Sequence, residues 1–158
     1  MANRQKDSNE EGSVPRDASL SHMPLLLAQH GFIADSIVDG PGLRCTVFVQ
    51  GCPHACPGCH NPATHPFEGG VPTTAGALFE RIRQSPLCRA VTLSGGEPFC
   101  QAEGLLVLAS LLKAEGYELA AYTGYSFEAL LAGTDAQRAL LKQLDTLVDG
   151  QFVLEKRD

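Results

Sequence analysis

Residues 43–60 read LRCTVFVQGCPHACPGCH: an apolar run enters a loop that holds three cysteines. β-Branched and aromatic residues dominate the run and Gly51 ends it, which is typical of a strand in a sheet. We therefore predict a strand over 43–50 that delivers Cys52, Cys56 and Cys59 to one end of a sheet. Three thiolates with the spacing C-x3-C-x2-C can face a common centre. They are one ligand short of a closed tetrahedral metal site, so one position is left for a further ligand.

Strands and helices alternate along the rest of the chain. Further strands are predicted over 90–93, 118–122 and 145–148, and residues 31–37 read as a short edge strand. Helices are predicted over 74–84, 101–115, 126–131 and from Thr134 or Asp135 to about 144, with polar caps at several starts. This order is typical of a parallel α/β sheet. Only about four to five βα units fit, whereas a closed eight-unit barrel needs ~250 residues. The fold class is therefore α/β, with an open parallel sheet or a partial (β/α) barrel.

Composition bounds the class of protein. The chain has 158 residues, 44% of them hydrophobic, and a formal net charge of −6. Lys and Arg form no basic stripe, which argues against a nucleic-acid surface, and no apolar stretch is long enough to span a membrane. Residues 1–23 are polar, lack the centre of a signal peptide, and are predicted to be a disordered leader before a domain over 24–158. A cytoplasmic location is expected, where clustered cysteines favour a metal or catalytic site over a disulfide framework.

Four loops follow the predicted parallel strands, and ligands of such folds bind beyond the carboxyl ends of the strands. The loops cover residues 52–59, 94–98, 123–125 and 149–150, and each contains glycine, which lets a ligand approach the backbone closely. The second loop reads SGGEP, in which Glu97 adds a carboxylate where an ammonium group could bind. These four loops are the predicted rim of the site.

The cysteine loop has two interpretations. One is structural zinc, with Cys52, Cys56 and Cys59 joined by His54 or His60. The other is an iron–sulfur cluster held by three thiolates, with one iron left for an exogenous ligand. Zinc ribbons usually bring a second C-x2-C pair, which this sequence lacks, and the glycines and carboxylate of 95–97 favour the cluster.

With these two motifs in this order, the chain resembles the radical S-adenosylmethionine superfamily. More narrowly, it resembles the activating proteins of anaerobic (class III) ribonucleoside-triphosphate reductase. The narrower resemblance is carried by VDGPGLR (38–44), VFVQGCPH (47–54), CPGCHNP (56–62), YTGY (122–125) and VDGQF (148–152), and it covers roughly residues 31–156. Two features depart from the wider pattern. Gly58 stands where many members have an aromatic residue, and the chain ends at Asp158, before the family's usual Gly-, Ser- and Asn-rich tail, so that C-terminal truncation is one interpretation.

The resemblance implies a fold of the radical S-adenosylmethionine type and a set of site residues. Cys52, Cys56 and Cys59 would bind a 4Fe-4S cluster, whose free iron would chelate the methionine part of S-adenosylmethionine. The implied contacts to that cofactor are Gly58, Cys59 and His60 along the adenosyl part, Gly95, Gly96 and Glu97 around the amino group, and Thr123 and Gly124 near the ribose or adenine.

The resemblance also implies an activity. Reductive cleavage of S-adenosylmethionine would give methionine and a 5′-deoxyadenosyl radical, which would take a hydrogen atom from a glycine of the anaerobic reductase large subunit. A reduced flavodoxin or ferredoxin would be the electron donor. Two alternatives stay open: another small enzyme of the superfamily, of the pyruvate formate-lyase activase type or of deazapurine synthesis, and a non-catalytic zinc-binding module.

Several other polar residues are interpreted as structural. Cys45 is expected in the core, Cys88 to be structural before its strand, and Cys100 to be a small buried side chain near the rim. Tyr122 and Tyr125 are expected to pack, Arg44 to lie at the surface, His54 and His60 to serve the loop or face solvent, and Asp149 either to end its strand or to contact a ligand.

Overall fold

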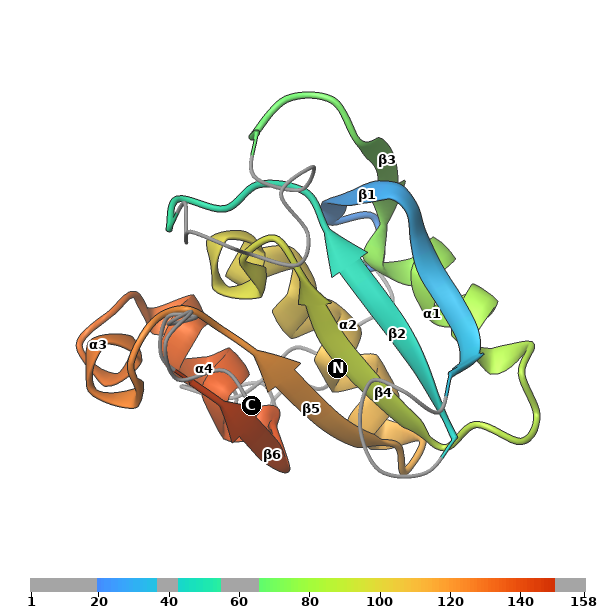
Figure 1. The fold of residues 1–158 in the computed structure, drawn as a ribbon. Coiled ribbons are helices and arrows are strands. Elements are labelled where there is room, and N and C mark those ends of the chain that lie inside the picture. Colours follow the sequence, from blue (N-terminus) through green and yellow to red (C-terminus); the bar gives the residue numbers. More distant parts are fainter. Residues whose placement is uncertain (1–19, 37–42, 55–65, 150–158) are drawn as a thin grey trace, which may run out of the picture.

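The structure is a computed structural model of the chain, and it describes residues 20–36, 43–54 and 66–149. Within these ranges the strands form one mixed sheet with the order β3-β1-β2-β4-β5-β6 (Figure 1). Strands β2 (Arg44–Val49), β4 (Ala90–Gly95), β5 (Glu118–Tyr122) and β6 (Thr146–Val148) run parallel, with Thr46 opposite Thr92 and Ala121 opposite Leu147. The predicted α/β class and its parallel strands are confirmed. The carboxyl ends of these strands lie at one edge of the sheet.

Two antiparallel strands extend the sheet beyond β2. β1 (Pro24–Ser36) pairs with β2 on one side and with β3 (Val71–Thr74) on the other. The predicted short edge strand over 31–37 was therefore wrong: β1 has 13 residues and lies inside the sheet. His30 has a φ of 54° and the register with β2 shifts between Leu27 and Phe32, so a bulge breaks the alternation by which a strand is recognised in sequence.

The helices lie close to their predicted positions; the first follows β3, and the others follow the parallel strands β4 and β5. They are α1 (Ala75–Arg83), the 3₁₀ helix η4 (Pro98–Gln101), α2 (Ala102–Ala114), α3 (Phe127–Leu131) and α4 (Asp135–Gln143). The hydroxyls of Thr74, Ser126 and Thr134 accept hydrogen bonds from backbone N–H groups of the first helical turns, and Thr134 forms a capping box with Gln137. Short-range capping thus sets where three of these helices begin.

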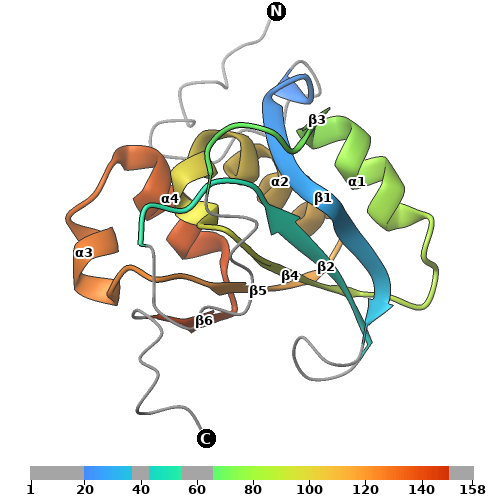
Figure 2. The same cartoon turned by 45° about the horizontal axis from the view of Figure 1, so that its top comes forward.

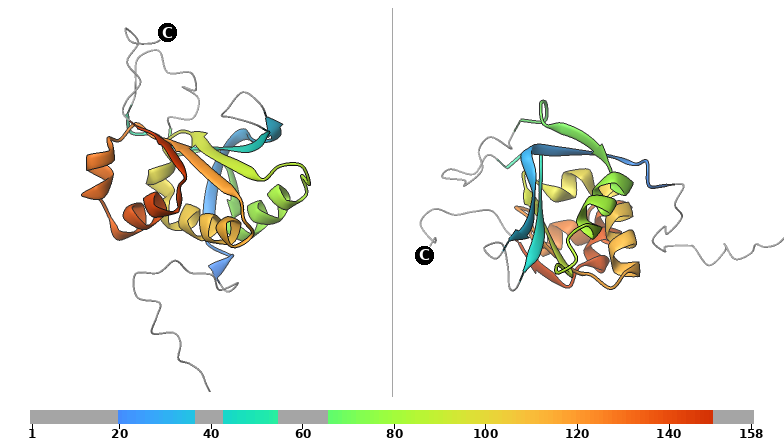
Figure 3. Two further views of the ribbon diagram at one scale, coloured as in Figure 1. Left: turned by 90° about the horizontal axis from the view of Figure 1, so that it is seen from below. Right: turned by 90° about the vertical axis from the view of Figure 1, so that its right-hand side faces the viewer.

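The core lies between one face of the sheet and helices α1, α2 and α4, which lie on the same side of it (Figure 2, Figure 3). α2 is central and brings Leu105, Leu108 and Leu112, all 0% exposed, onto the strands. Cys45 and Cys88 are also fully buried, which confirms their structural interpretation. Among the described residues, no helix is long and apolar enough to cross a membrane.

Arg44 does not lie at the surface, as the sequence suggested; it is fully buried. Its Nε donates to Thr92 Oγ1 at 2.7 Å, and its Nη1 lies 3.2 Å from Glu118 Oε1. With these partners on β4 and β5, the guanidinium extends over the neighbouring strands instead of entering water. Arg44 thereby links the amino ends of β2, β4 and β5.

The predicted leader over 1–23 is described only from Leu20. Leu20 and Met23 are partly buried against the core, and the Ala75 N–H donates to the Met23 carbonyl at 2.9 Å. Residues 1–19 lie outside the described ranges, and the domain boundary stays a prediction.

Candidate functional site

The rim loops after β2, β4 and β5 meet at one buried carboxylate. Glu97 is 0% exposed and accepts four hydrogen bonds, two on each oxygen. Oε1 lies 2.7 Å from His54 Nε2 and accepts from the Gly124 N–H at 2.8 Å. Oε2 accepts from the Thr123 hydroxyl at 2.7 Å and from the Phe99 N–H at 3.0 Å. A carboxylate has about four acceptor sites, so Glu97 is saturated by its own chain.

The backbone places Glu97 at the end of β4. Gly95 has a φ of +94°, and a Cβ there would lie 2.4 Å from Val49 N, so only glycine allows β4 to turn this close to β2. The Gly96 N–H then donates to the Val49 carbonyl, and the Glu97 N–H donates to the Gly51 carbonyl, each at 2.7 Å. The second rim loop is therefore fastened to the start of the cysteine loop by backbone hydrogen bonds as well as through His54.

His54 packs into a small enclosure beside Glu97. Its side chain is 7% exposed, and its ring meets that of Tyr125 edge-on, with centroids 4.6 Å apart and an interplanar angle of 77°. A Cβ on Gly124 would lie 2.4 Å from His54 Cδ2, so the absence of a side chain at Gly124 makes room for the imidazole. The expectation that His54 serves the loop holds, but its pairing with Glu97 was missed.

Tyr125 and Cys100 border this enclosure. The Tyr125 hydroxyl lies 3.8 Å from Cys100 Sγ, and burial raises the pKa of Tyr125 to about 12, with smaller contributions from Cys100, Glu97 and Cys52. Partial burial of its thiol likewise raises the pKa of Cys100, although the residue as a whole is exposed. The prediction of a buried Cys100 was wrong, because η4 turns this side chain outward beside the buried Phe99.

Tyr122 and Asp149 also lie near the rim, and only Asp149 agrees with its interpretation from the sequence. Tyr122, expected to pack, is 42% exposed, because the neighbouring Ala121 takes the core-facing position on β5. Asp149 accepts a hydrogen bond from the Phe127 N–H at 2.8 Å and so joins the end of β6 to the start of α3. This contact agrees with the interpretation of Asp149 as a strand-ending residue.

The cysteine triad is only partly described. Cys52 is half-buried at the carboxyl end of β2 and forms no disulfide with the described residues. Cys56, Gly58, Cys59 and His60 lie outside the described ranges, so their predicted roles stay predictions. No group of three or more potential metal-ligating side chains occurs within 20–36, 43–54 and 66–149. Cys52 lies beside the glycine-rich loops at the strand ends, where the predicted cluster would be held.

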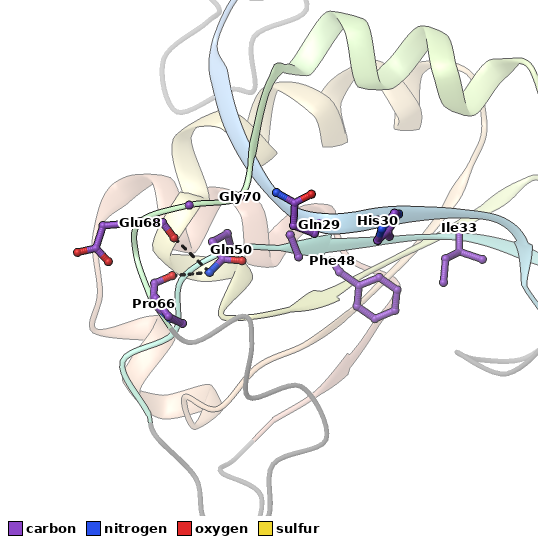
Figure 4. Close-up of a pocket in the computed structure, with 10 residues that line it drawn as sticks. Gln29, His30, Ile33, Phe48, Gln50, Pro66, Glu68 and Gly70 are labelled. Carbon is purple, nitrogen blue, oxygen red and sulfur yellow. Dashed lines mark hydrogen bonds between the residues drawn. The ribbon is translucent and has the colours of Figure 1, made fainter.

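Glutamine side chains, which the sequence did not single out, hold the neighbouring backbone. Gln101 exchanges two hydrogen bonds of 2.8 Å with the Leu26 backbone and donates to the Gln50 carbonyl at 3.0 Å. Gln50 Nε2 in turn donates to the carbonyl oxygens of Pro66 and Glu68 (Figure 4). A glutamine at the end of a strand or at the start of a helix gives no local signal, so only the fold reveals these contacts.

A pocket of about 560 Å³ lies beside Gln50, between the bulge of β1, strand β2 and the segment that leads into β3 (Figure 4). It is lined by Ala28, Gln29, His30, Ile33, Phe48, Gln50, Pro66, Glu68, Gly69 and Gly70. None of the residues that converge on Glu97 lines it. The pocket therefore neighbours the predicted rim without containing it.

Comparisons with known proteins match most of the chain. The family described as "4Fe-4S single cluster domain" matches residues 38–158. The chain is 35% identical over 137 residues to the anaerobic ribonucleoside-triphosphate reductase-activating protein of Escherichia coli K12, covering 82% of this chain and 87% of that protein. It is 36% identical over 141 residues to the protein of that name from Vibrio cholerae, covering 82% and 86%. It is also 38% identical over 125 residues to the pyruvate formate-lyase-activating enzyme of Clostridium pasteurianum, covering 73% of this chain and 52% of that enzyme.

Proposed function

Because this chain belongs to the family of anaerobic ribonucleoside-triphosphate reductase-activating proteins, which are radical S-adenosylmethionine enzymes, we propose that it installs a glycyl radical on the large subunit of such a reductase. The structural observation that supports this is the convergence of three rim loops on Glu97. That convergence brings the loop that begins with Cys52 together with the loops at Gly95 and Thr123.

The residues proposed to hold the cofactors lie on these loops. Cys52, Cys56 and Cys59 would ligate a 4Fe-4S cluster, and when bound the cluster supplies one electron that cleaves S-adenosylmethionine to methionine and a 5′-deoxyadenosyl radical. Gly58, Cys59 and His60 would contact the adenosyl part through their backbone. Thr123 and Gly124 would serve the ribose or adenine, and Gly95, Gly96 and Glu97 would surround the amino group.

The saturation of Glu97 refines that last assignment. Its carboxylate accepts four hydrogen bonds inside the chain and is 0% exposed, whereas Gly95 and Gly96 are partly exposed. We therefore assign the direct contacts with the amino group to backbone atoms of the two glycines. Glu97 would act by holding the loops on which those contacts depend. The task of the chain is then placement of the reacting groups and exclusion of water.

A test combines metal analysis with spectroscopy. The full chain, purified without oxygen, should contain iron and acid-labile sulfide. When it is reduced and incubated with S-adenosylmethionine and the large subunit of an anaerobic ribonucleotide reductase, a glycyl radical doublet should appear in the electron paramagnetic resonance spectrum. Cys56→Ala should abolish S-adenosylmethionine cleavage while leaving most helix content, and Cys100→Ala, a cysteine outside the triad, is the matched control that should keep it. Stoichiometric zinc without sulfide would overturn the proposal.

Pyruvate formate-lyase is a second candidate partner, favoured by the 38% identity to an activating enzyme of that lyase. That match spans only half of the relative, which makes the reductase the better supported partner. Parallel incubations with the two partners decide between them, because the radical should form on only one. A reduced flavodoxin or ferredoxin as the electron donor, and a cytoplasmic location, remain part of the proposal.

A further inference from the structure

His54 belongs to the cysteine loop, but its side chain is buried among the other rim loops. It lies between Cys52 and Cys56 in the chain, and its side chain contacts Glu97 and Tyr125, which belong to the other rim loops. Its Nε2 lies 2.7 Å from Oε1 of the fully buried Glu97, and its side chain is 7% exposed. A nearly buried polar ring with a short contact to a buried carboxylate has a defined orientation.

Packing restricts the imidazole independently of that hydrogen bond. On one side Gly124 leaves space in which an added Cβ would lie 2.4 Å from Cδ2 and 2.7 Å from Nε2 of His54. On another side the Tyr125 ring meets it edge-on. The φ of Gly124 lies outside the left-handed region, so the backbone there would accept alanine. The space for His54 is therefore the reason for glycine at residue 124.

We infer that His54 is a positioning residue: its imidazole fastens the start of the cysteine loop to the loop after β5, through Glu97 and across Gly124. The Glu97 N–H already donates to the Gly51 carbonyl, and His54 adds a side-chain connection between Cys52 and the loop at Thr123 without being a cluster ligand itself. This inference rests on the proposed function for its consequence in catalysis. The fastening itself is a property of the chain without its cofactors and can be measured there.

The contact between His54 and Gly124 predicts that the effects of substitutions at these two residues do not add. Gly124→Ala should displace the imidazole and release the cysteine loop, as His54→Ala does by removing the ring. Once the ring is gone, however, the methyl group at residue 124 has nothing to displace. Gly124→Ala should therefore be harmful in the native chain and nearly without further effect in His54→Ala, so that the two effects fail to add. His54→Gln, whose amide nitrogen can replace Nε2, should retain most of the fastening.

The experiment is hydrogen exchange of the Gly96 and Glu97 amides, which donate to the Val49 and Gly51 carbonyls at the start of the cysteine loop. It is measured in the full chain prepared without cluster, on the native protein and the variants His54→Gln, His54→Ala, Gly124→Ala and His54→Ala/Gly124→Ala. Loss of one hydrogen bond of ordinary strength predicts exchange about tenfold faster in His54→Ala and Gly124→Ala. The double variant should match His54→Ala within about twofold, and His54→Gln should stay near the native rate. In the reconstituted protein, His54→Ala should raise the KM for S-adenosylmethionine more than it lowers kcat.

Unchanged exchange in His54→Ala, or additive effects of the two alanine substitutions, would overturn the inference. Loss of iron and sulfide in His54→Ala with native exchange would mean that His54 is a ligand and would overturn it as well. Failure of the proposed function can be told apart from failure of this inference. If the native protein contained no iron and sulfide, the proposed function would fail, but the exchange measurements on the cluster-free chain would still test the role of His54.

Discussion

Two fully buried charged side chains lie at opposite ends of the same parallel strands. Arg44, at the amino end, reaches Thr92 on β4 and Glu118 on β5. Glu97, at the carboxyl end, reaches His54 after β2 and Thr123 after β5. Each links three successive segments of the sheet, and both are 0% exposed.

The partners differ in kind. Arg44 bonds to side chains that the strand ladder already holds in place, and its ionic partner Glu118 is 44% exposed. Glu97 bonds to groups on loops, which have no ladder of their own, and it supplies the fixed point where they meet. The amino end thus uses a buried charge to support the strands, whereas the carboxyl end uses one to arrange the loops that are expected to carry the chemistry. Substitutions at the two ends should separate stability from function.

The largest effect is expected for Glu97→Gln. Glutamine keeps the shape of the side chain, but its NH₂ group replaces one acceptor oxygen. The donors that faced that oxygen are then buried without an acceptor. We expect the free energy of unfolding to fall by about 3 kcal/mol or more, because each buried donor left without an acceptor costs about 1–3 kcal/mol. Urea denaturation of the cluster-free chain measures this, and the reconstituted variant should also lose S-adenosylmethionine cleavage. Native stability in this variant would mean that the rim does not depend on Glu97.

A smaller effect, confined to stability, is expected for Arg44→Met. Methionine fills a similar volume, and Glu118 can turn to water because it is already 44% exposed. We expect a loss of about 2 kcal/mol in urea denaturation, chiefly from hydrogen bonds such as that to Thr92. Formation of the glycyl radical per bound cluster should stay native. A variant that kept its stability and lost radical formation would break the contrast between the two ends.

Thr123→Val tests one of the four hydrogen bonds that Glu97 accepts. The Thr123 hydroxyl donates to Glu97 Oε2 and accepts from the Tyr125 N–H at 3.1 Å, and valine removes both contacts at almost constant volume. We expect a loss of about 1–2 kcal/mol, measured by urea denaturation. Thr123→Ser keeps the hydroxyl and is the matched control. Equal losses in the two variants would show that the methyl group, and not the hydroxyl, is what matters at this residue.

Local patterns explain what the sequence could predict. The apolar periodicity of α2, the caps at Ser126 and Thr134, and the run that became β2 are short-range features, and the structure confirms the elements they predicted. The cysteine spacing and the SGGEP loop are local patterns too, which is why the sequence could predict the family and the enzyme class. The relatives confirm both. The length of β1 could not be predicted, since residues with positive φ and a register shift interrupt its alternation.

Long-range pairings explain what was missed. His54 meets Glu97 across 43 residues of sequence, Arg44 meets Thr92 across 48, and Gln101 meets Leu26 across 75. Arg44 taken alone is consistent with a solvated polar residue, which is how it was interpreted. All cluster and cofactor contacts stay predictions, and Cys56, Gly58, Cys59 and His60 also lie outside the part of the chain that the structure describes.

The smallest effect is expected for an exposed carboxylate, Asp145, which sharpens the contrast with buried Glu97. Its side chain is 43% exposed, and the hydrogen bond from Lys113 Nζ at 2.7 Å lowers the pKa of Asp145 below its usual 3.8. A depressed folded-state pKa stabilises the protein above the unfolded-state value, and this stabilisation is lost as the pH falls. Asp145→Asn should therefore cost less than about 1 kcal/mol at pH 7 and progressively less below about pH 4, because solvent screens the pair. Urea denaturation at pH 7 and below about pH 4 checks this, with Lys113→Met as the matched variant. A stability difference between the native protein and Asp145→Asn that grows on acidification would contradict it.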